Sequence, residues 1–242
     1  LVQITDSFGV RRFNSNPRKY VLQMLAEHKS PRLDDLPAFT GGLVGYFGYD
    51  YAKYAEPKLK LDAADDAHFK DMDLMLFDKV IAFDNLNDCV FLICNMQTAD
   101  VENNYAAAVS EIEIMAEVIE SGKPAEIERP VLKSEFKPLF SEKEYCKMVE
   151  KTKHYIKEGD IFQAVISNRL EAKMSGSLFE TYKVLRCLNP SPYMFYFSSN
   201  DIEIAGASPE TLVKLENGTL YTYPLAGTRP RGKTAEEDAR LE

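Results

Sequence analysis

One short segment of the chain carries residue types that could hold a small polar substrate. In PLAGTRPRG (residues 224–232), Gly227 stands between Ala226 and Thr228. A glycine at such a position leaves backbone N–H groups open to a ligand, and the threonine adds a hydroxyl donor. A loop that binds an anion or a carbonyl oxygen is one interpretation of this pattern.

Charged side chains accompany this segment in the sequence. Glu210 follows a proline at the start of an expected strand, and taken alone it is typical of a surface carboxylate. Arg229 and Arg231 have the guanidinium fork that suits substrate carboxylates. Ion pairs within the protein are the other interpretation of these arginines, and the one we favour.

Other motifs invite functional interpretations that their chemistry does not support. The glycines of GGLVGYFGYD (41–50) alternate with aromatic residues and do not open a helix, so a strand with close backbone packing is favoured over a phosphate loop. An acidic run lacks the ligand order and the glycine of a calcium loop, which indicates a solvated loop. Its members are Asp62, Asp65, Asp66, Asp71 and Asp73.

Composition limits the classes of partner. The 242 residues are 45% hydrophobic and 28% charged, and the net charge of -9 argues against a nucleic-acid partner. No run approaches the 18 apolar residues of a membrane helix, so we expect no membrane span. The four cysteines form no CxxC pair, which predicts reduced thiols and a cytoplasmic protein.

Helices are predicted where caps and apolar periodicity coincide. Asn16-Pro17 starts one short helix, and the apolar stripe over residues 100–121 predicts another that ends at Gly122. Two capping boxes predict the starts of two further helices, the first reaching Gly159 and the second Leu188. Their residues are Ser141 with Glu144, and Ser177 with Glu180.

Strands are predicted from period-2 alternation. Residues 74–95 predict strands joined by a tight turn, and residues 160–170 predict a strand that presents Gln163 on its polar face. Residues 193–224 predict an antiparallel meander, with Asn217-Gly218 as its strongest turn signal.

A proline-containing charged stretch over residues 126–137 predicts a boundary, with an N-terminal region over 1–130 and a second domain over 131–242. The chain starts without Met or a signal peptide and stops inside an expected helix. We therefore expect it to be truncated at both ends.

Four segments carry a resemblance to a known family. They are GGLVGYFGYD (41–50), GDIFQAVISNRL (159–170), NPSPYMFYF (189–197), and GASPE (206–210) with PLAGTRPRG (224–232). In this order and spacing they resemble the chorismate-utilising enzymes, and most closely the family of anthranilate synthase component I. The resemblance implies an α+β fold, with antiparallel sheets sandwiched between helices and incomplete in this chain. The α+β pattern above agrees with it.

The resemblance also implies roles for individual residues. Gly227 and Thr228 match residues that contact chorismate, and Glu210 matches an active-site acid that helps the C4 hydroxyl leave. The turn of the NPSPYMFYF segment matches a feedback pocket for L-tryptophan, whose other wall, a Leu-Leu-Glu-Ser segment, is absent here. The residues of that turn are Pro192, Tyr193 and Met194.

Two positions favour anthranilate synthase within the family. Isochorismate synthases resemble this chain but carry a lysine where Gln163 stands, because their water nucleophile needs a base. Aminodeoxychorismate synthases often carry a nucleophilic lysine where Ala226 stands. Those two enzymes, or a non-catalytic fragment that binds a ligand or a partner, are the alternatives.

By resemblance, chorismate and ammonia give anthranilate and pyruvate in tryptophan biosynthesis. The ammonia comes from a glutamine amidotransferase, component II, and Mg²⁺ holds the ring carboxylate. The magnesium ligands are expected after Glu242, so we expect this stretch by itself to be inactive.

Overall fold

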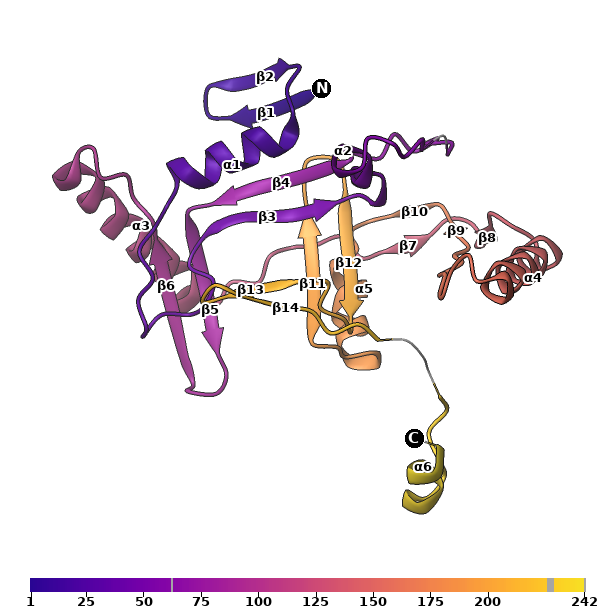
Figure 1. Cartoon of the computed structure of the whole chain (residues 1–242). Coiled ribbons are helices and arrows are strands. Elements are labelled where there is room, and N and C mark those ends of the chain that lie inside the picture. The colour runs from indigo at the N-terminus through magenta and orange to yellow at the C-terminus, as the bar shows by residue number, and fades with distance from the viewer. Residues whose placement is uncertain (62, 226–228, 242) are drawn as a thin grey trace. The chain divides into compact units, whose positions relative to one another are not determined.

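A computed structural model of the chain describes residues 1–61, 63–225 and 229–241, which form two units (Figure 1). The units are Leu1–Pro124 and Ala125–Glu242. The division falls just before the charged, proline-containing stretch. Which domain type each unit represents stays a prediction.

The first unit consists of antiparallel hairpins and helices. The described elements are β1 (Val2–Asp6), β2 (Gly9–Phe13), α1 (Pro17–Glu27), β3 (Gly42–Phe47), a 3₁₀ turn η1 (Tyr49–Tyr51), α2 (Ala52–Ala55), β4 (Met72–Phe77), β5 (Lys79–Asp84), β6 (Cys89–Cys94) and α3 (Val101–Ser121). Strand β1 pairs with β2, β3 with β4 and β5 with β6, and α3 contacts β6. The predicted tight turn is the one between β5 and β6. Its Asp84 carboxylate accepts hydrogen bonds from the Leu86 and Asn87 backbones.

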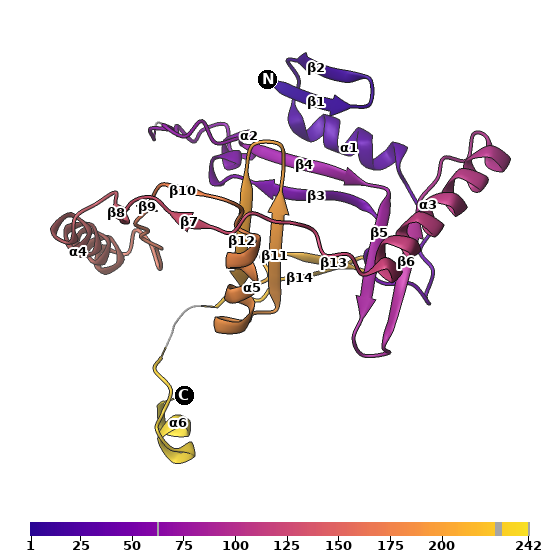
Figure 2. The same ribbon diagram turned by 180° about the vertical axis from the view of Figure 1, so that it is seen from behind.

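The second unit repeats this local antiparallel pairing. Its described elements are β7 (Val131–Leu132), β8 (Lys137–Pro138), α4 (Glu142–Glu158), β9 (Leu170–Glu171), β10 (Met174–Ser175), α5 (Phe179–Leu188), β11 (Tyr193–Ser198), β12 (Glu203–Ser208), β13 (Lys214–Glu216), β14 (Thr219–Tyr221) and α6 (Ala235–Leu241). Strand β7 pairs with β10, β8 with β9, β11 with β12 and β13 with β14. Helix α5 lies along the β11–β12 hairpin in both views (Figures 1 and 2).

Caps decide where the long helices start and stop. The Asn16 side chain accepts from the Arg18 N–H at the start of α1, and Gly122 ends α3 in the left-handed conformation. Ser141 and Glu144 form the predicted capping box of α4, which ends at Gly159 with φ 83°. These predictions are confirmed.

The predicted capping box of α5 is wrong, because a more distant carboxylate takes its place. The Ser177 hydroxyl does accept from the Phe179 N–H at 3.1 Å, but Glu180 forms an ion pair with Lys183 at 2.8 Å. Glu203 of β12 accepts from the Leu178 N–H at 2.6 Å and from the Ser177 hydroxyl at 3.2 Å. The hydrogen bond from Leu178 outweighs burial and lowers the pKa of Glu203.

The predicted strand over residues 160–170 is also wrong, since only Leu170–Glu171 pairs within the described chain. A side chain replaces the missing ladder. The Asn168 amide accepts from the Phe140 N–H at 3.0 Å and donates to the Phe140 carbonyl at 2.9 Å. Phe162, which the alternation would place on the packed face opposite Gln163, is 99% exposed.

The predicted meander is two separate hairpins, because β12 and β13 do not pair. Pro209, directly after β12, has no N–H to donate to a ladder. The Asn217-Gly218 turn is confirmed. Both residues have positive φ, 50° and 79°, as a tight hairpin turn requires.

Candidate active site

The β13–β14 hairpin places Glu210 beside the segment that leads into the predicted substrate loop. Within the hairpin, Lys214 pairs with Tyr221. Continuing that register outward sets Glu210 opposite Leu225, and the Glu210 carboxylate accepts from the Leu225 N–H at 3.2 Å. A second bond, from the Thr222 hydroxyl to the Leu212 carbonyl at 3.1 Å, holds the same two segments together. The predicted acid therefore bonds the residue that directly precedes Ala226 in the chain.

The three central residues of the predicted loop lie outside the described residues. They are Ala226, Gly227 and Thr228.

The chain that follows these residues is held by Asp238. The Arg231 guanidinium donates to Asp238 at 2.8 Å, and the other Asp238 oxygen accepts from the Gly232 N–H at 2.8 Å. These bonds lower the pKa of Asp238, the Gly232 N–H being the larger cause. Arg229 donates to the Leu241 carbonyl. For Arg231 the favoured interpretation, an ion pair within the protein, is confirmed.

The turn predicted to bind tryptophan is joined to the Glu210 segment. The Tyr193 hydroxyl shares a hydrogen bond of 2.6 Å with the Thr211 hydroxyl, next to Glu210 in the chain. The Ser191 hydroxyl donates to the Met194 sulfur at 3.4 Å. Tyr193 pairs with Ser208 at the end of the β11–β12 ladder. Pro192 directly precedes β11 and is exposed.

Gln163 is not brought into this group by any contact of the described residues. It lies exposed in the irregular segment between α4 and β9. The segment is fixed further along, where the Tyr145 hydroxyl donates to the Ile166 carbonyl at 2.9 Å. A place for Gln163 next to chorismate stays a prediction.

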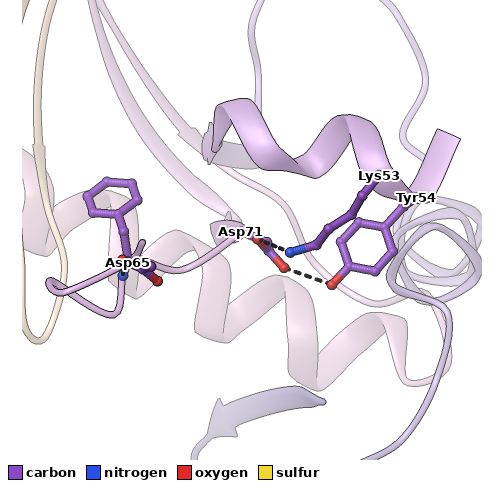
Figure 3. A network of polar contacts seen from close by, with 5 residues as sticks. Lys53, Tyr54, Asp65 and Asp71 are labelled. Carbon is purple, nitrogen blue, oxygen red and sulfur yellow. Dashed lines mark hydrogen bonds and ion pairs between the residues drawn. The ribbon is translucent and has the colours of Figure 1, made fainter. Parts of the chain in front are cut away.

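The first unit has a polar cluster of its own, which joins Asp71 of the acidic run to α2 (Figure 3). Asp71 accepts from the Lys53 ammonium at 2.7 Å and from the Tyr54 hydroxyl at 2.8 Å. Burial raises the pKa of Asp71, but the bonds from Lys53 and Tyr54 outweigh it and the net shift is downward. The expectation of a solvated loop is therefore wrong at Asp71, and also at Asp73, which lies on β4 and pairs with Lys70 at 3.0 Å. Asp62 lies outside the described residues.

No group of three or more His, Cys, Asp or Glu side chains in the described ranges could hold a metal ion. The described helices include none long and apolar enough to cross a membrane. All four cysteines are free thiols.

Comparison with known proteins assigns the chain to a family. Residues 3–242 match a protein family described as "chorismate binding enzyme". This chain is a member of the chorismate binding enzyme family. Its fold is similar to that of anthranilate synthase component I from Streptococcus pneumoniae TIGR4, with a TM-score of 0.70 and 29% identity over 86% of this chain and 47% of that one. The expected α+β chorismate-enzyme fold is thereby confirmed.

Two curated relatives of the chain carry different enzyme names. Anthranilate synthase component 1 of Acinetobacter calcoaceticus is 39% identical over 94% of this chain and 48% of its own. Aminodeoxychorismate synthase component 1 of Bacillus subtilis is 37% identical over 86% of this chain and 44% of its own. The chain thus spans about half the length of the curated relatives it matches.

Sequence reasoning missed Leu225 and Thr211, which bond at or beside Glu210 in this member of the chorismate binding enzyme family, and Glu203, which caps α5. The partner of Glu210, Leu225, could have been found by counting outward from the Asn217-Gly218 turn. Thr211 and Glu203 had no such local signal, because their partners come from other elements.

Proposed function

We propose that the protein containing this chain is the large component of an anthranilate synthase, which converts chorismate and ammonia to anthranilate and pyruvate. The contact between Glu210 and Leu225 supports this most directly, because it sets a carboxyl group beside the entry to the Gly227-Thr228 loop. Family membership and the names of the relatives support the same substrate class.

The proposed chemistry divides between the two sides of the hairpin. Glu210 protonates the C4 hydroxyl of chorismate as that group leaves, while ammonia adds at C2. The backbone N–H groups around Gly227 and the Thr228 hydroxyl bind the substrate and hold it in line with the acid. Elimination of pyruvate then gives the aromatic product.

Two residues favour ammonia as the nucleophile. A water nucleophile needs a base, and the neutral amide of Gln163 cannot act as one at ordinary pH. A covalent route through an enzyme amine needs a lysine, and Ala226 has no nucleophilic atom. Direct addition of ammonia requires neither group.

The ammonia is proposed to come from a glutamine amidotransferase, the component II that the component 1 names imply. Magnesium, proposed to hold the ring carboxylate in the full-length protein, has no fitting ligand set among the described residues. We therefore assign no step to it here. A cytoplasmic location is proposed from the reduced thiols that the sequence predicts.

The decisive test is a product assay with the full-length protein, chorismate, Mg²⁺ and ammonium. Anthranilate fluorescence is the expected result. The second candidate, suggested by the Bacillus subtilis relative, would release aminodeoxychorismate, which chromatography separates from anthranilate. If a folded, magnesium-loaded protein formed neither product, the proposal would be wrong.

Thr228→Ala should lower kcat/KM by about tenfold or more, because it removes a hydroxyl donor proposed to bind the substrate. Steady-state kinetics with varied chorismate would measure the loss. Thr219→Ala, at an exposed threonine on β14 of the same hairpin, is the matched control and should change kcat/KM less than about threefold. Equal, small effects of both variants would remove Thr228 from the substrate site.

Met194→Thr tests the proposed inhibition by L-tryptophan. Shortening the side chain at this turn should raise the tryptophan concentration for half-inhibition about tenfold, since an apolar contact is lost. The KM for chorismate should change less than about twofold. Parallel changes in inhibition and KM would instead mean that Met194 supports the fold of the hairpin.

A further inference from the structure

The segment that carries Glu210 has no strand ladder of its own. Residues 209–213 connect β12 to β13, which do not pair, and Leu212 is 89% exposed. A short exposed connection samples several conformations unless other contacts fix it. The position of the Glu210 carboxylate therefore depends on contacts made by its neighbours.

Three hydroxyl groups supply such contacts to the segment. The Ser208 hydroxyl donates to the Glu210 carbonyl at 3.4 Å. The Thr222 hydroxyl holds the Leu212 carbonyl toward β14, at 3.1 Å. On the other side, the Tyr193 hydroxyl shares its bond with Thr211 at 2.6 Å. Tyr193 is itself fixed, because its backbone pairs with Ser208 in the β11–β12 ladder.

The Tyr193–Thr211 bond acts at the residue next to Glu210 in the chain. A tyrosine reaches far from its strand with only two side-chain torsions, so it can fix a distant partner at small entropic cost. Losing this bond would free Thr211 to rotate, and Glu210 would move with it. Among the described residues, the Leu225 N–H is the hydrogen-bond partner of the Glu210 carboxylate itself, so the rest of the segment is held only through neighbouring residues and the Glu210 carbonyl.

We infer that Tyr193 and Thr211 are positioning residues for Glu210, acting through the hydrogen bond between their hydroxyl groups. The inference rests on the proposed function, in which Glu210 is the acid. It gives Tyr193 a role in turnover in addition to the proposed contact with tryptophan. The bond links the end of the β11–β12 hairpin to the reacting group.

The test removes each hydroxyl in the full-length protein, with tryptophan left out of all assays. Tyr193→Phe and Thr211→Val should each lower kcat about three- to tenfold, with KM for chorismate changed less than about twofold, because a displaced acid affects the reacting step more than binding. Thr211→Ser keeps the hydroxyl and should retain most of kcat. The double variant should be no slower than the slower single variant, as expected for two ends of one bond.

Tyr221→Phe is the matched control. The Tyr221 hydroxyl makes no hydrogen bond within the described residues, and its loss should leave kcat within about 1.5-fold. Amide hydrogen exchange of peptides covering 209–213 gives a readout independent of activity. Exchange should be faster in Tyr193→Phe and Thr211→Val than in the wild type or Tyr221→Phe.

The outcomes distinguish failure of the proposed function from failure of the positioning role of Tyr193 and Thr211. A wild-type protein that forms no product contradicts the proposed function, while faster exchange in the two variants would still support the positioning bond. An active wild type with unchanged kcat and unchanged exchange in both variants overturns the inference. Multiplying losses in the double variant would also overturn it, since independent effects do not arise from one shared bond.

Discussion

Replacing Glu210 with glutamine is expected to lower kcat by about 10²- to 10⁴-fold, the range typical of a lost general acid. Glutamine keeps the shape of the side chain and an oxygen that can still accept from the Leu225 N–H. It cannot supply a proton to the C4 hydroxyl. The loss should therefore fall on the chemical step and leave the KM for chorismate nearly unchanged.

The measurement is steady-state anthranilate formation by the full-length protein. Glu216→Gln serves as the matched control, because Glu216 is a partly exposed carboxylate on β13 of the same hairpin, paired with Lys214 at 3.0 Å. We expect it to keep kcat within about twofold. A Glu210→Gln protein within threefold of the wild type would exclude Glu210 as the acid, whatever the control shows.

Gly45→Ala is expected to destabilise the first unit by about 3 kcal/mol, the upper part of the range for overpacking a close contact. A Cβ built at Gly45 would lie 1.9 Å from the Asp73 carbonyl oxygen and 2.9 Å from the Leu74 Cα. Both atoms belong to the backbone of β4, which cannot move aside without breaking the β3–β4 pairing. Only glycine permits this approach.

Urea unfolding of the full-length protein, followed by a probe in the first unit, would measure the change. The control is Gly48→Ala, a few residues further along, where a Cβ would lie 3.3 Å from its nearest neighbour and φ is -64°. Gly48→Ala should lower the free energy of unfolding much less than Gly45→Ala does. Equal urea midpoints for Gly45→Ala and the wild type would show that β3 and β4 can move apart without loss of stability.

Local signals predicted the elements whose stabilising contacts are also local. Asn16, Gly122 and the Ser141–Glu144 box act within one helix turn of their own backbone, so their sequence positions were sufficient. The Asn217-Gly218 turn was predictable for the same reason. These signals gave the helix ends and the hairpin that sets the site.

Prediction failed where a partner from another element replaced the local one. Ser177 and Glu180 have capping-box spacing, yet Glu203 of β12, and not Glu180, accepts the hydrogen bond at the helix start. Alternation over residues 160–170 is real, but the Asn168 amide bonds the Phe140 backbone, and the ladder with β8 is confined to Leu170 and Glu171. Spacing along a sequence does not reveal such competitors, because only the folded backbone brings them near.

The same limit applied to the candidate site. Resemblance identified Glu210, but nothing in the local pattern indicated that Tyr193 would reach Thr211. The contact requires the β11–β12 ladder to place the tyrosine and the break at Pro209 to free the threonine. Both conditions depend on how neighbouring hairpins fold.

The register of the β13–β14 hairpin limits which length changes this region can accept during evolution or engineering. One residue added at the Asn217-Gly218 turn would either be absorbed as a bulge or shift every pair beyond it. A shifted register would move the partner of Glu210 from Leu225 to an adjacent residue, whose N–H points the opposite way. Homologous turns should therefore differ in composition far more readily than in length.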